Sequence, residues 1–192
     1  MDKIAGGNDL EAIRDRVVDQ ATGHVLEIGS GTGANFLSYA DSITSLTTVD
    51  PNPGMNRRAR QRIKFVEFPV DSRELSCEEL PMKDASFDCV VSTLTMCSLE
   101  NLGDCLSEIY RVLKPGGRLL FLEHGVCQEA KVSKWQRRLT PLQCRLFVGC
   151  RLDRSIDGAV REAGFEIAHL DTYFLPNVPK AMGFMYEGVA TK

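Results

Sequence analysis

Residues 25–33 read Val-Leu-Glu-Ile-Gly-Ser-Gly-Thr-Gly. The apolar residues at the start of this stretch end a short run that is typical of a buried strand. The three glycines that follow, Gly29, Gly31 and Gly33, allow the backbone to bend sharply and to approach a ligand closely. A helix is expected next, over residues 34–40. A strand, a glycine-rich turn and a helix in this order predict a β-α unit with a ligand site at the carboxyl end of the strand.

Outside this unit, short β-rich runs alternate with helical stretches. Strands are expected at residues 24–28, 45–49, 63–68, 87–94, 118–123, 165–172 and 182–190. Helices are expected at residues 8–20, 34–40, 55–62 and 102–113. This alternation predicts a doubly wound α/β fold with a mostly parallel, seven-stranded, Rossmann-like sheet and helices on both faces. The loop at 176–179 is too short for a parallel crossover, so the last two strands are expected to form an antiparallel hairpin.

The bulk composition is that of an ordinary globular domain. The chain has 192 residues, of which 43% are hydrophobic and 26% charged, and a net charge of −3. A negative net charge argues against non-specific nucleic-acid binding. No apolar stretch reaches the roughly 20 residues of a membrane-spanning helix, and the first ten residues lack the apolar core of a signal peptide. A cytoplasmic protein is therefore expected, with attachment to a membrane surface left open.

The cysteines do not form a familiar pattern. Seven are present, at positions 77, 89, 97, 105, 127, 144 and 150. Their number is odd and no C-x-x-C pair occurs, so the spacing predicts neither a disulfide framework nor a zinc site. We expect reduced, largely buried thiols and no metal.

Two carboxylates accompany the glycine turn. Glu27 lies two residues before Gly29, and Asp50 ends the expected second strand. Glu27 would repel a pyrophosphate but attract the ammonium group of S-adenosylmethionine, directly or through water. A carboxylate at the place of Asp50 accepts hydrogen bonds from both ribose hydroxyls. The pair favours S-adenosylmethionine over NAD; the alternatives are that both carboxylates only cap turns, or that the domain is purely structural.

Several motifs together resemble the class I methyltransferases of the ubiquinone/menaquinone-biosynthesis type. They are the glycine turn, DPN at 50–52, LPM at 80–82, SFDCVV at 86–91 and LKPGG at 113–117. The resemblance covers residues 23–123 and implies an S-adenosylmethionine-dependent methyltransferase that releases S-adenosylhomocysteine. The implied architecture is an N-terminal helix (1–22), a cofactor-binding core (23–123), a helical cover over the acceptor pocket (124–163) and a C-terminal hairpin (164–192).

The glycine turn and the resemblance together imply a set of cofactor-binding residues. The set is Glu27, Gly29, Ser30, Gly31, Gly33, Asn35, Asp50, Pro51, Asn52, Ser76, Cys77, Glu78, Thr93 and Leu94. The methionine end would lie against the glycine turn and Asn35, and the ribose against Asp50. Residues 51–52 would lie beside the adenine and residues 93–94 would face the sulfonium. Residues 76–78 match the place where the family reads the adenine amine, although many members have Asp where this chain has Ser76.

The second half of the chain resembles a narrower group, the small-molecule thiol S-methyltransferases of the methyltransferase-like group and their bacterial relatives. The motifs are TLTMCS at 93–98, FLEHG at 121–125, Trp135-Gln136 and GCRLDR at 149–154. Within them, Glu123 and His124 follow the fifth strand and are the candidate catalytic pair, as proton acceptor or acceptor-orienting groups, because imidazole titrates near neutral pH. Alternatively, Glu123 caps a turn and His124 packs against the next helix. Cys97 lies in an apolar run that is more typical of a core.

A basic stretch covers residues 131–151. Its cations have no acidic residue between them: Lys131, Lys134, Arg137, Arg138, Arg145 and Arg151. Apolar side chains interleave with them at helical spacing: Trp135, Leu139, Leu142 and Leu146. Thr140 and Pro141 are expected to divide the stretch into two helices, with Thr as N-cap and Pro in the first turn. These helices are expected to wall the acceptor pocket and could contact anionic lipid; the alternative is a solvated basic face.

The sequence thus predicts methyl transfer from S-adenosylmethionine to a small-molecule acceptor, preferably a thiol, without nucleic acid as partner. Two enzymatic alternatives remain: a lipid head-group N-methyltransferase of the phosphatidylethanolamine type, and a quinone C-methyltransferase. The alternative from another class is a non-catalytic module that only binds S-adenosylmethionine.

Overall fold

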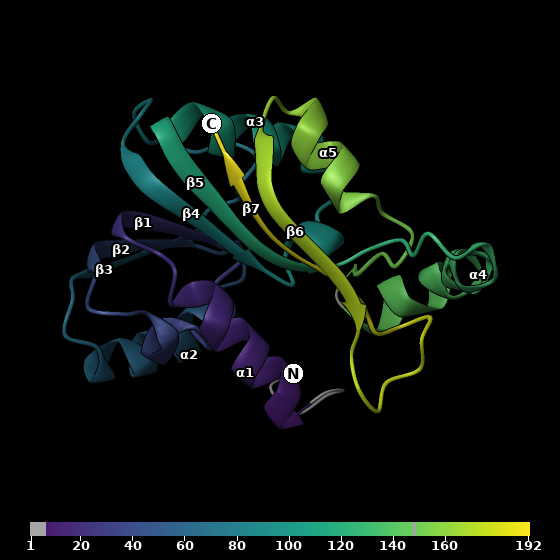
Figure 1. Cartoon of the computed structure of the whole chain (residues 1–192). Helices are drawn as coiled ribbons and strands as arrows, with labels where there is room; N and C mark the ends of the chain where they lie inside the picture. Colours follow the sequence, from purple (N-terminus) through teal and green to yellow (C-terminus); the bar gives the residue numbers. More distant parts are fainter. Residues whose placement is uncertain (1–6, 148) are drawn as a thin grey trace.

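The computed structural model describes residues 7–147 and 149–192. A seven-stranded sheet in the order β3-β2-β1-β4-β5-β7-β6 forms its centre (Figure 1). Its strands are β1 (Gly23–Ile28), β2 (Ile43–Val49), β3 (Val70–Arg73), β4 (Phe87–Thr93), β5 (Leu113–His124), β6 (Glu166–Phe174) and β7 (Phe184–Thr191). Strand β7 runs antiparallel to both of its neighbours, while the other neighbouring pairs are parallel. The predicted sheet with its C-terminal antiparallel hairpin is confirmed.

Helices cover both faces of the sheet. They are α1 (Gly7–Val18), α2 (Pro53–Arg62), α3 (Leu102–Val112), α4 (Ala130–Leu146) and α5 (Ile156–Glu162). Figure 1 shows α1 and α2 on one face and α3 and α5 on the other, with α4 beyond the edge of these layers. The chain runs outward from β1 to β3 and then returns to β4, so the strand order reverses between β1 and β4. Ligands of such sheets bind at the carboxyl ends of the strands beside this reversal.

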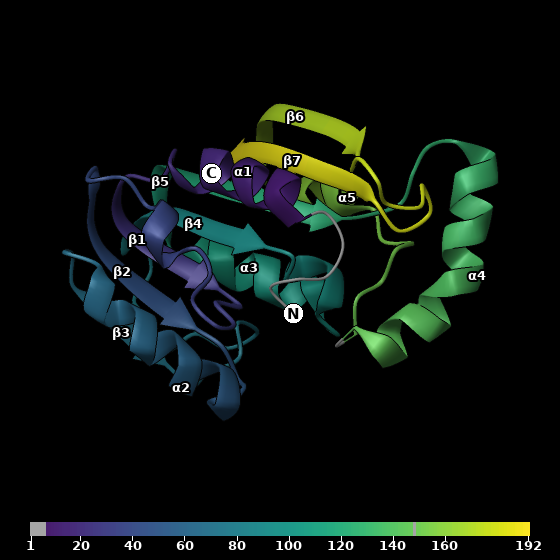
Figure 2. The same cartoon turned by 90° about the horizontal axis from the view of Figure 1, so that it is seen from below.

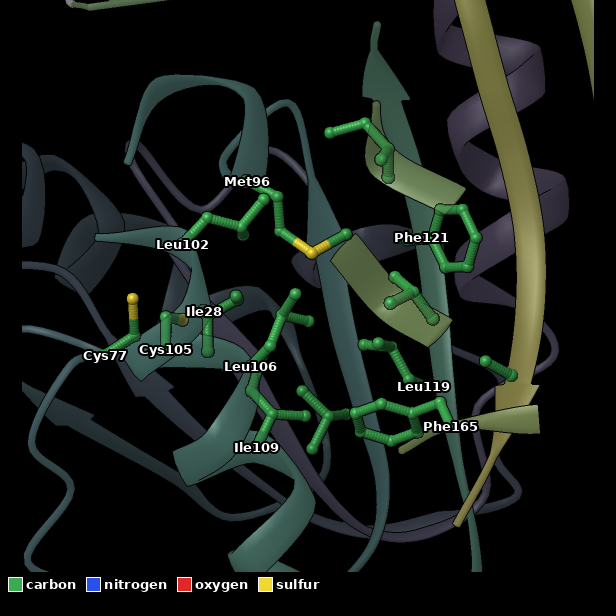
Figure 3. Packing of buried hydrophobic residues seen from close by; sticks show 14 of the residues in the cluster. Ile28, Cys77, Met96, Leu102, Cys105, Leu106, Ile109, Leu119, Phe121 and Phe165 are labelled. Atoms are coloured by element: carbon green, nitrogen blue, oxygen red, sulfur yellow. The ribbon is translucent and has the colours of Figure 1, made fainter. Parts of the chain in front are cut away.

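The apolar stripe predicted for residues 102–113 is the buried face of α3. Leu106 and Ile109 are fully buried and pack with Leu119 and Phe121 of β5 and with Phe165 (Figure 3). Burial of each such side chain stabilises the fold by about 1.5–3 kcal/mol. This cluster fixes β5 against β4 and thereby the two strand ends that border the ligand site.

Two predicted elements are wrong. The third strand is Val70–Arg73, not residues 63–68; there, Ile63–Phe65 forms a 3-10 turn after α2. The run is apolar because Val66 and Phe68 pack against the core on the α1 side of the sheet, and periodicity cannot assign so short a run. The helix predicted at 34–40 is only the 3-10 turn Phe36–Ser38, since a segment this short forms too few hydrogen bonds to offset helix nucleation.

The basic stretch is one helix and not two. Helix α4 continues through Pro141, and the Thr140 hydroxyl donates to the carbonyl oxygen of Gln136 at 2.9 Å instead of capping a new helix. Proline removes one backbone hydrogen bond and bends a helix, and α4 is bent in Figure 2. Within the described part of the chain, no helix combines the length and the apolar character needed to cross a membrane.

Candidate active site

A cavity of about 850 Å³ opens at the carboxyl ends of the central strands. Its volume lies within the range of roughly 300–1,000 Å³ that is typical of small-molecule sites. One end is lined by Gly29, Gly31, Asp50, Pro51, Asn52, Pro53 and Met55. The other end is lined by Leu94, Thr95, Cys97, Ser98, Leu99, His124, Gln143, Phe147, Cys150, Leu175, Val178 and Met182, with Leu10, Glu11 and Arg14 of α1 also in the wall.

The three glycines of the turn share a backbone conformation but differ in their surroundings. All have positive φ, +64° at Gly29, +53° at Gly31 and +75° at Gly33. A Cβ at Gly29 would lie 2.2 Å from Oγ1 of Thr95, and one at Gly33 would lie 2.7 Å from the ring of Phe36. A Cβ at Gly31 would meet no protein atom closer than 3.9 Å, and Gly31 lines the cavity. The missing side chain at Gly31 therefore leaves room for a ligand.

Glu27 lies behind the glycine turn, outside the residues that line the cavity. It is 1% exposed, and its carboxylate accepts hydrogen bonds from Nδ2 of Asn35 and from the hydroxyl of Tyr39, each at 2.9 Å. Asn35 also donates to Oγ1 of Thr93 at 2.9 Å. Burial raises the pKa of Glu27 to about 7, although the bonds from Tyr39 and Asn35 oppose the shift. Tyr39 completes this network, and no sequence motif pointed to it.

Asp50 joins the glycine turn to the turn after β2. One of its carboxylate oxygens accepts from the backbone N–H of Gly31 at 2.9 Å, and the other from that of Asn52 at 2.8 Å. The side chain of Asn52 in turn caps α2 by accepting from the N–H groups of Gly54 and Met55. Each carboxylate oxygen can accept more than one hydrogen bond, so Asp50 retains acceptor capacity toward the cavity that it lines.

The remaining predicted cofactor contacts divide into two groups. Leu94 lines the cavity with a positive φ of 53°, whereas Thr93 lies behind it in the Asn35 network. Residues 76–78 do not belong to the cavity wall. Their side chains are occupied locally: Cys77 lies in the core beside Cys105, and Glu78 accepts from the backbone of residue 101. The adenine contact assigned to Ser76, Cys77 and Glu78 stays a prediction.

Two buried polar atoms near the turn lack a hydrogen-bond partner within the described part of the chain. They are Oγ of Ser30 and Oδ1 of Asn35. Unsatisfied buried polar atoms cost free energy and are typical of sites that a ligand or water completes. Neither Ser30 nor Asn35 lines the cavity, so the fit of the polar amino-acid and ribose groups of S-adenosylmethionine rests on the open space at Gly31 and the acceptor capacity of Asp50.

Glu123 is fully buried and anchors a loop. Its carboxylate accepts from the hydroxyl of Ser92 at 2.7 Å and from the backbone N–H groups of Thr95, Met96 and Cys97 at 3.0–3.1 Å. It is absent from the cavity wall. These hydrogen bonds favour the turn-capping alternative, in which Glu123 positions the loop that carries Cys97, and its role as a proton acceptor stays a prediction.

His124 reaches the cavity and meets two cysteines there. The Sγ atom of Cys150 lies 3.6 Å from Nδ1 of His124 and 3.6 Å from Sγ of Cys97. Burial lowers the pKa of His124, but its contact with Cys97 and the charge of Glu123 outweigh this and leave the pKa raised. The bond with Cys97 lowers the pKa of the Cys150 thiol against the effect of burial. Cys97 is buried, as expected of a core residue, but it also lines the cavity.

Comparison with known proteins identifies the family of this chain. Residues 26–121 match the family described as methyltransferase domain. The chain is 34% identical over 175 residues to the thiol S-methyltransferase TMT1B of Rattus norvegicus, covering 83% of this chain and 68% of that protein. It is 37% identical over 148 residues to the thiol S-methyltransferase TMT1A of Homo sapiens, covering 73% and 59%. The chain belongs to the methyltransferase-domain family.

A solved structure of a methyltransferase shares the fold of this chain. The N-methyltransferase NodS of Bradyrhizobium japonicum, in complex with S-adenosyl-L-homocysteine, superposes with a TM-score of 0.74 at 18% identity and covers 100% of this chain and 89% of its own. The prediction of a class I methyltransferase that depends on S-adenosylmethionine is confirmed. Which atoms of this methyltransferase contact the cofactor remains a prediction from the cavity wall.

Proposed function

We propose that this methyltransferase transfers the methyl group of S-adenosylmethionine to the sulfur of a small thiol. The observation that carries the proposal is the cavity itself. It runs from the glycine turn and Asp50 at one end to Cys97, His124 and Cys150 at the other. The names of the relatives at 34% and 37% identity support a thiol as acceptor.

At the cofactor end, the chain supplies shape and hydrogen bonds. Asp50 would hold the ribose hydroxyls with the acceptor capacity left after its bonds to Gly31 and Asn52. Pro51 and Asn52 would lie beside the adenine. The amino-acid part would lie against Gly29 and Gly31, where the Glu27 carboxylate behind the turn favours a cation.

At the acceptor end, the wall is largely apolar and comes from several segments. Leu94 and Leu99 follow β4, Phe147 follows α4, and Leu175 and Met182 belong to the loop between β6 and β7. Such a wall selects a small apolar acceptor and excludes water. S-adenosylmethionine supplies an electrophilic methyl carbon on a positively charged sulfur. The protein has to align an attacking sulfur in line with that carbon, and His124 favours the thiolate form of the acceptor.

Thiols need little further help because their pKa of about 8.5 leaves a fraction already ionised near neutral pH. An amine or a quinol carbon would call for a dedicated proton acceptor. The carboxylate next to His124 does not offer one, since all four of its hydrogen bonds hold Ser92 and the backbone of residues 95–97. His124 is then the one proton acceptor proposed for this site, which favours the thiol, the acceptor that depends least on such a group, over the amine and quinone alternatives.

The proposed function is tested by incubating the purified protein with S-adenosylmethionine and, separately, with hydrogen sulfide, an alkyl thiol, phosphatidylethanolamine and a quinol. Mass spectrometry of the products should detect a methyl thioether or methanethiol. It should detect little methylation of the amine or of the quinol ring. Methylation confined to nitrogen or to a ring carbon would instead support the corresponding alternative.

We also propose that α4 rests on an anionic membrane surface. Its exposed face carries Trp135, Leu142 and Leu146, which are 56%, 57% and 63% exposed. The side chains that α4 buries are mostly small or polar: Val132, Ser133, Gln136, Thr140 and Gln143. Exposed cations flank the apolar residues: Lys131, Lys134, Arg137, Arg138 and Arg145. Large apolar groups on the solvent side of a basic helix are typical of helices that lie in a membrane interface, and this favours contact with lipid over a solvated basic face.

A further inference from the structure

Three side chains from distant parts of the sequence converge at the acceptor end of the cavity. Cys97 lies in the 3-10 turn Met96–Ser98 after β4, His124 ends β5, and Cys150 follows α4. Their potential ligand atoms all lie within 4.8 Å of one another. All three residues line the cavity. Two thiols and an imidazole are the side chains that zinc and related thiophilic cations prefer.

The spacing of these atoms fits a tetrahedral cation. The two sulfurs are 3.6 Å apart, and Sγ of Cys150 is 3.6 Å from Nδ1 of His124. Zinc bonds of about 2.3 Å to sulfur and about 2.0 Å to nitrogen, at tetrahedral angles, place the ligand atoms roughly 3.5–3.8 Å apart. A disulfide would require the sulfurs to approach to about 2.05 Å. Two of the three pairs of ligand atoms are therefore already spaced for shared coordination of one ion, and the third pair lies within 4.8 Å.

We propose that Cys97, His124 and Cys150 bind a zinc ion whose fourth coordination position opens into the cavity and takes the sulfur of the acceptor. The inference rests on the proposed function, because it assigns the acceptor class to a specific ligand position. Three protein ligands with one open position are the arrangement of catalytic zinc sites, whereas structural sites use four. The two cysteine ligands lie 53 positions apart in the sequence and are brought together by the fold. The absence of a C-x-x-C pair therefore does not argue against this zinc site.

The surroundings hold the three ligands in place. Glu123 accepts from the backbone N–H of Cys97 at 3.1 Å and directly precedes His124 in β5. The backbone N–H of Arg151 donates to the carbonyl oxygen of Cys97 at 2.9 Å, which ties the segment after Cys150 to the same loop. Hydrogen bonds that orient ligating groups contribute strongly to metal affinity. Two thiolates also balance the double charge of the ion, so that the buried site carries no net charge before the acceptor binds.

The reaction at this site balances without a further reactant. With His124 as a ligand, the cation takes over from the imidazole the role of favouring the thiolate, and the acceptor thiol releases its proton to water as its sulfur binds the cation. A lone pair of that sulfur forms the new bond to the methyl carbon, and the electron pair of the breaking carbon–sulfur bond stays on the sulfur of the cofactor. No group is oxidised or reduced. The product thioether is neutral and a weaker ligand than a thiolate, so it leaves the open position.

The test is zinc binding by the full chain. Protein purified under reducing conditions is stripped with a chelator, dialysed against buffered Zn²⁺ and analysed by inductively coupled plasma mass spectrometry. We expect about one zinc per chain. Replacement by Co²⁺ should give the intense visible bands of tetrahedral cobalt and a thiolate-to-cobalt charge-transfer band. A wild-type protein that retains no zinc and gives neither spectrum overturns the proposal, whatever the variants do.

Variants locate the site. Cys150→Ser and His124→Ala should each weaken zinc binding at least about 100-fold, since loss of a ligand exceeds the effect of 10–100-fold typical of its outer partners. Cys144→Ser is the matched control, because the Cys144 thiol contacts the backbone carbonyls of Gly149 and Cys150 and lies outside the trio. Circular dichroism identifies any variant that fails to fold. Unchanged zinc affinity in folded Cys150→Ser and His124→Ala protein would overturn the assignment.

Failure of this inference can be distinguished from failure of the proposed function. If the chelator-treated, zinc-free protein methylates thiols at the rate of the zinc-loaded protein, the proposed role of zinc in holding the acceptor sulfur is refuted while thiol methylation stands. If zinc binds to the trio but no thiol is methylated in either form, the proposed function and the role of the open position both fall. Zinc-dependent methylation of thiols supports both.

Discussion

The carboxylate of Asp50 accepts a hydrogen bond from the backbone N–H of Gly31 at 2.9 Å. This bond joins the end of β2 to the glycine turn after β1. The cofactor has to be held by both of these segments. Asp50 therefore shapes the turn and lines the cavity at the same time. Both roles predict that cofactor affinity depends on it.

Asp50→Ala should weaken binding of S-adenosylmethionine by about 1–3 kcal/mol, because the ribose hydroxyls and the N–H of Gly31 lose their acceptor. Isothermal titration calorimetry measures this directly. Asp71→Ala is the control, since Asp71 lies on the edge strand β3 and pairs there with Arg73 at the surface. Equal affinities of Asp50→Ala and wild type would contradict the ribose assignment.

Glu27 predicts an unusual pH dependence of stability. Burial raises its pKa in the folded protein from 4.5 to about 7, so between these values the folded state binds more protons than the unfolded state. The free energy of unfolding should therefore fall as the pH rises from about 4.5 to 7, by roughly 3 kcal/mol from this group. Urea denaturation at several pH values, without cofactor, measures the effect.

Glu27→Gln is the matched variant, because its amide resembles the protonated carboxyl and does not titrate. As the pH rises from about 4.5 to 7, the free energy of unfolding of Glu27→Gln should increase relative to that of the wild type. A difference that stays constant from pH 4.5 to 7 would show that Glu27 titrates as an ordinary carboxylate and that its burial is not maintained in solution.

Glu123 should behave as a structural group. Glu123→Ala leaves the buried N–H groups of residues 95–97 without their acceptor, and we expect a loss of at least about 3 kcal/mol of stability in chemical denaturation. Replacing the exposed Glu100 by alanine should change stability by less than about 0.5 kcal/mol. If Glu123→Ala is instead as stable as wild type but inactive, a catalytic role for Glu123 is restored.

The membrane proposal depends on the exposed face of α4. Vesicles with anionic lipid should sediment the wild-type protein at low salt. A triple variant with Trp135, Leu142 and Leu146 replaced by glutamine should bind the vesicles at least about tenfold more weakly. Phe65→Gln is the control, since Phe65 is 74% exposed but lies outside α4. Binding should also weaken as salt rises, because screening reduces the attraction of the basic residues. Equal sedimentation of triple variant and wild type would exclude this surface.

Local patterns in the sequence were sufficient to predict a seven-stranded, mostly parallel sheet with a C-terminal antiparallel hairpin, and they located six of its strands. The glycine turn at 29–33 and the continuous apolar run at 87–93 each depend on the chemistry of a few neighbouring residues. The segment 63–68 could not be assigned in the same way, because its apolar side chains pack on the core from a turn as well as they would from a strand. Which secondary structure this segment adopts depends on the residues that pack against it in the fold.

The candidate site was predictable only in part, for the same reason. Asp50 and the glycines occupy positions that strand and turn signals locate. The residues Cys97, His124 and Cys150 are separated by more than 20 residues at each step. Each lies in a motif shared with the thiol S-methyltransferases, but no single short motif contains all three, and only the packing of α4 and β5 around the cavity brings them together. The Tyr39 contact with Glu27 is likewise a consequence of the turn that replaced the predicted helix.

The proposed function requires that the methyl group of S-adenosylmethionine be transferred to the sulfur of the acceptor. The most direct measurement uses S-adenosylmethionine with a deuterated methyl group and an equimolar mixture of an alkyl thiol, phosphatidylethanolamine and a quinol. High-resolution mass spectrometry then shows which product carries the label. We expect the label to accumulate in the thioether, and to do so only with active protein. Label on nitrogen or on a ring carbon, with none on sulfur, would contradict it.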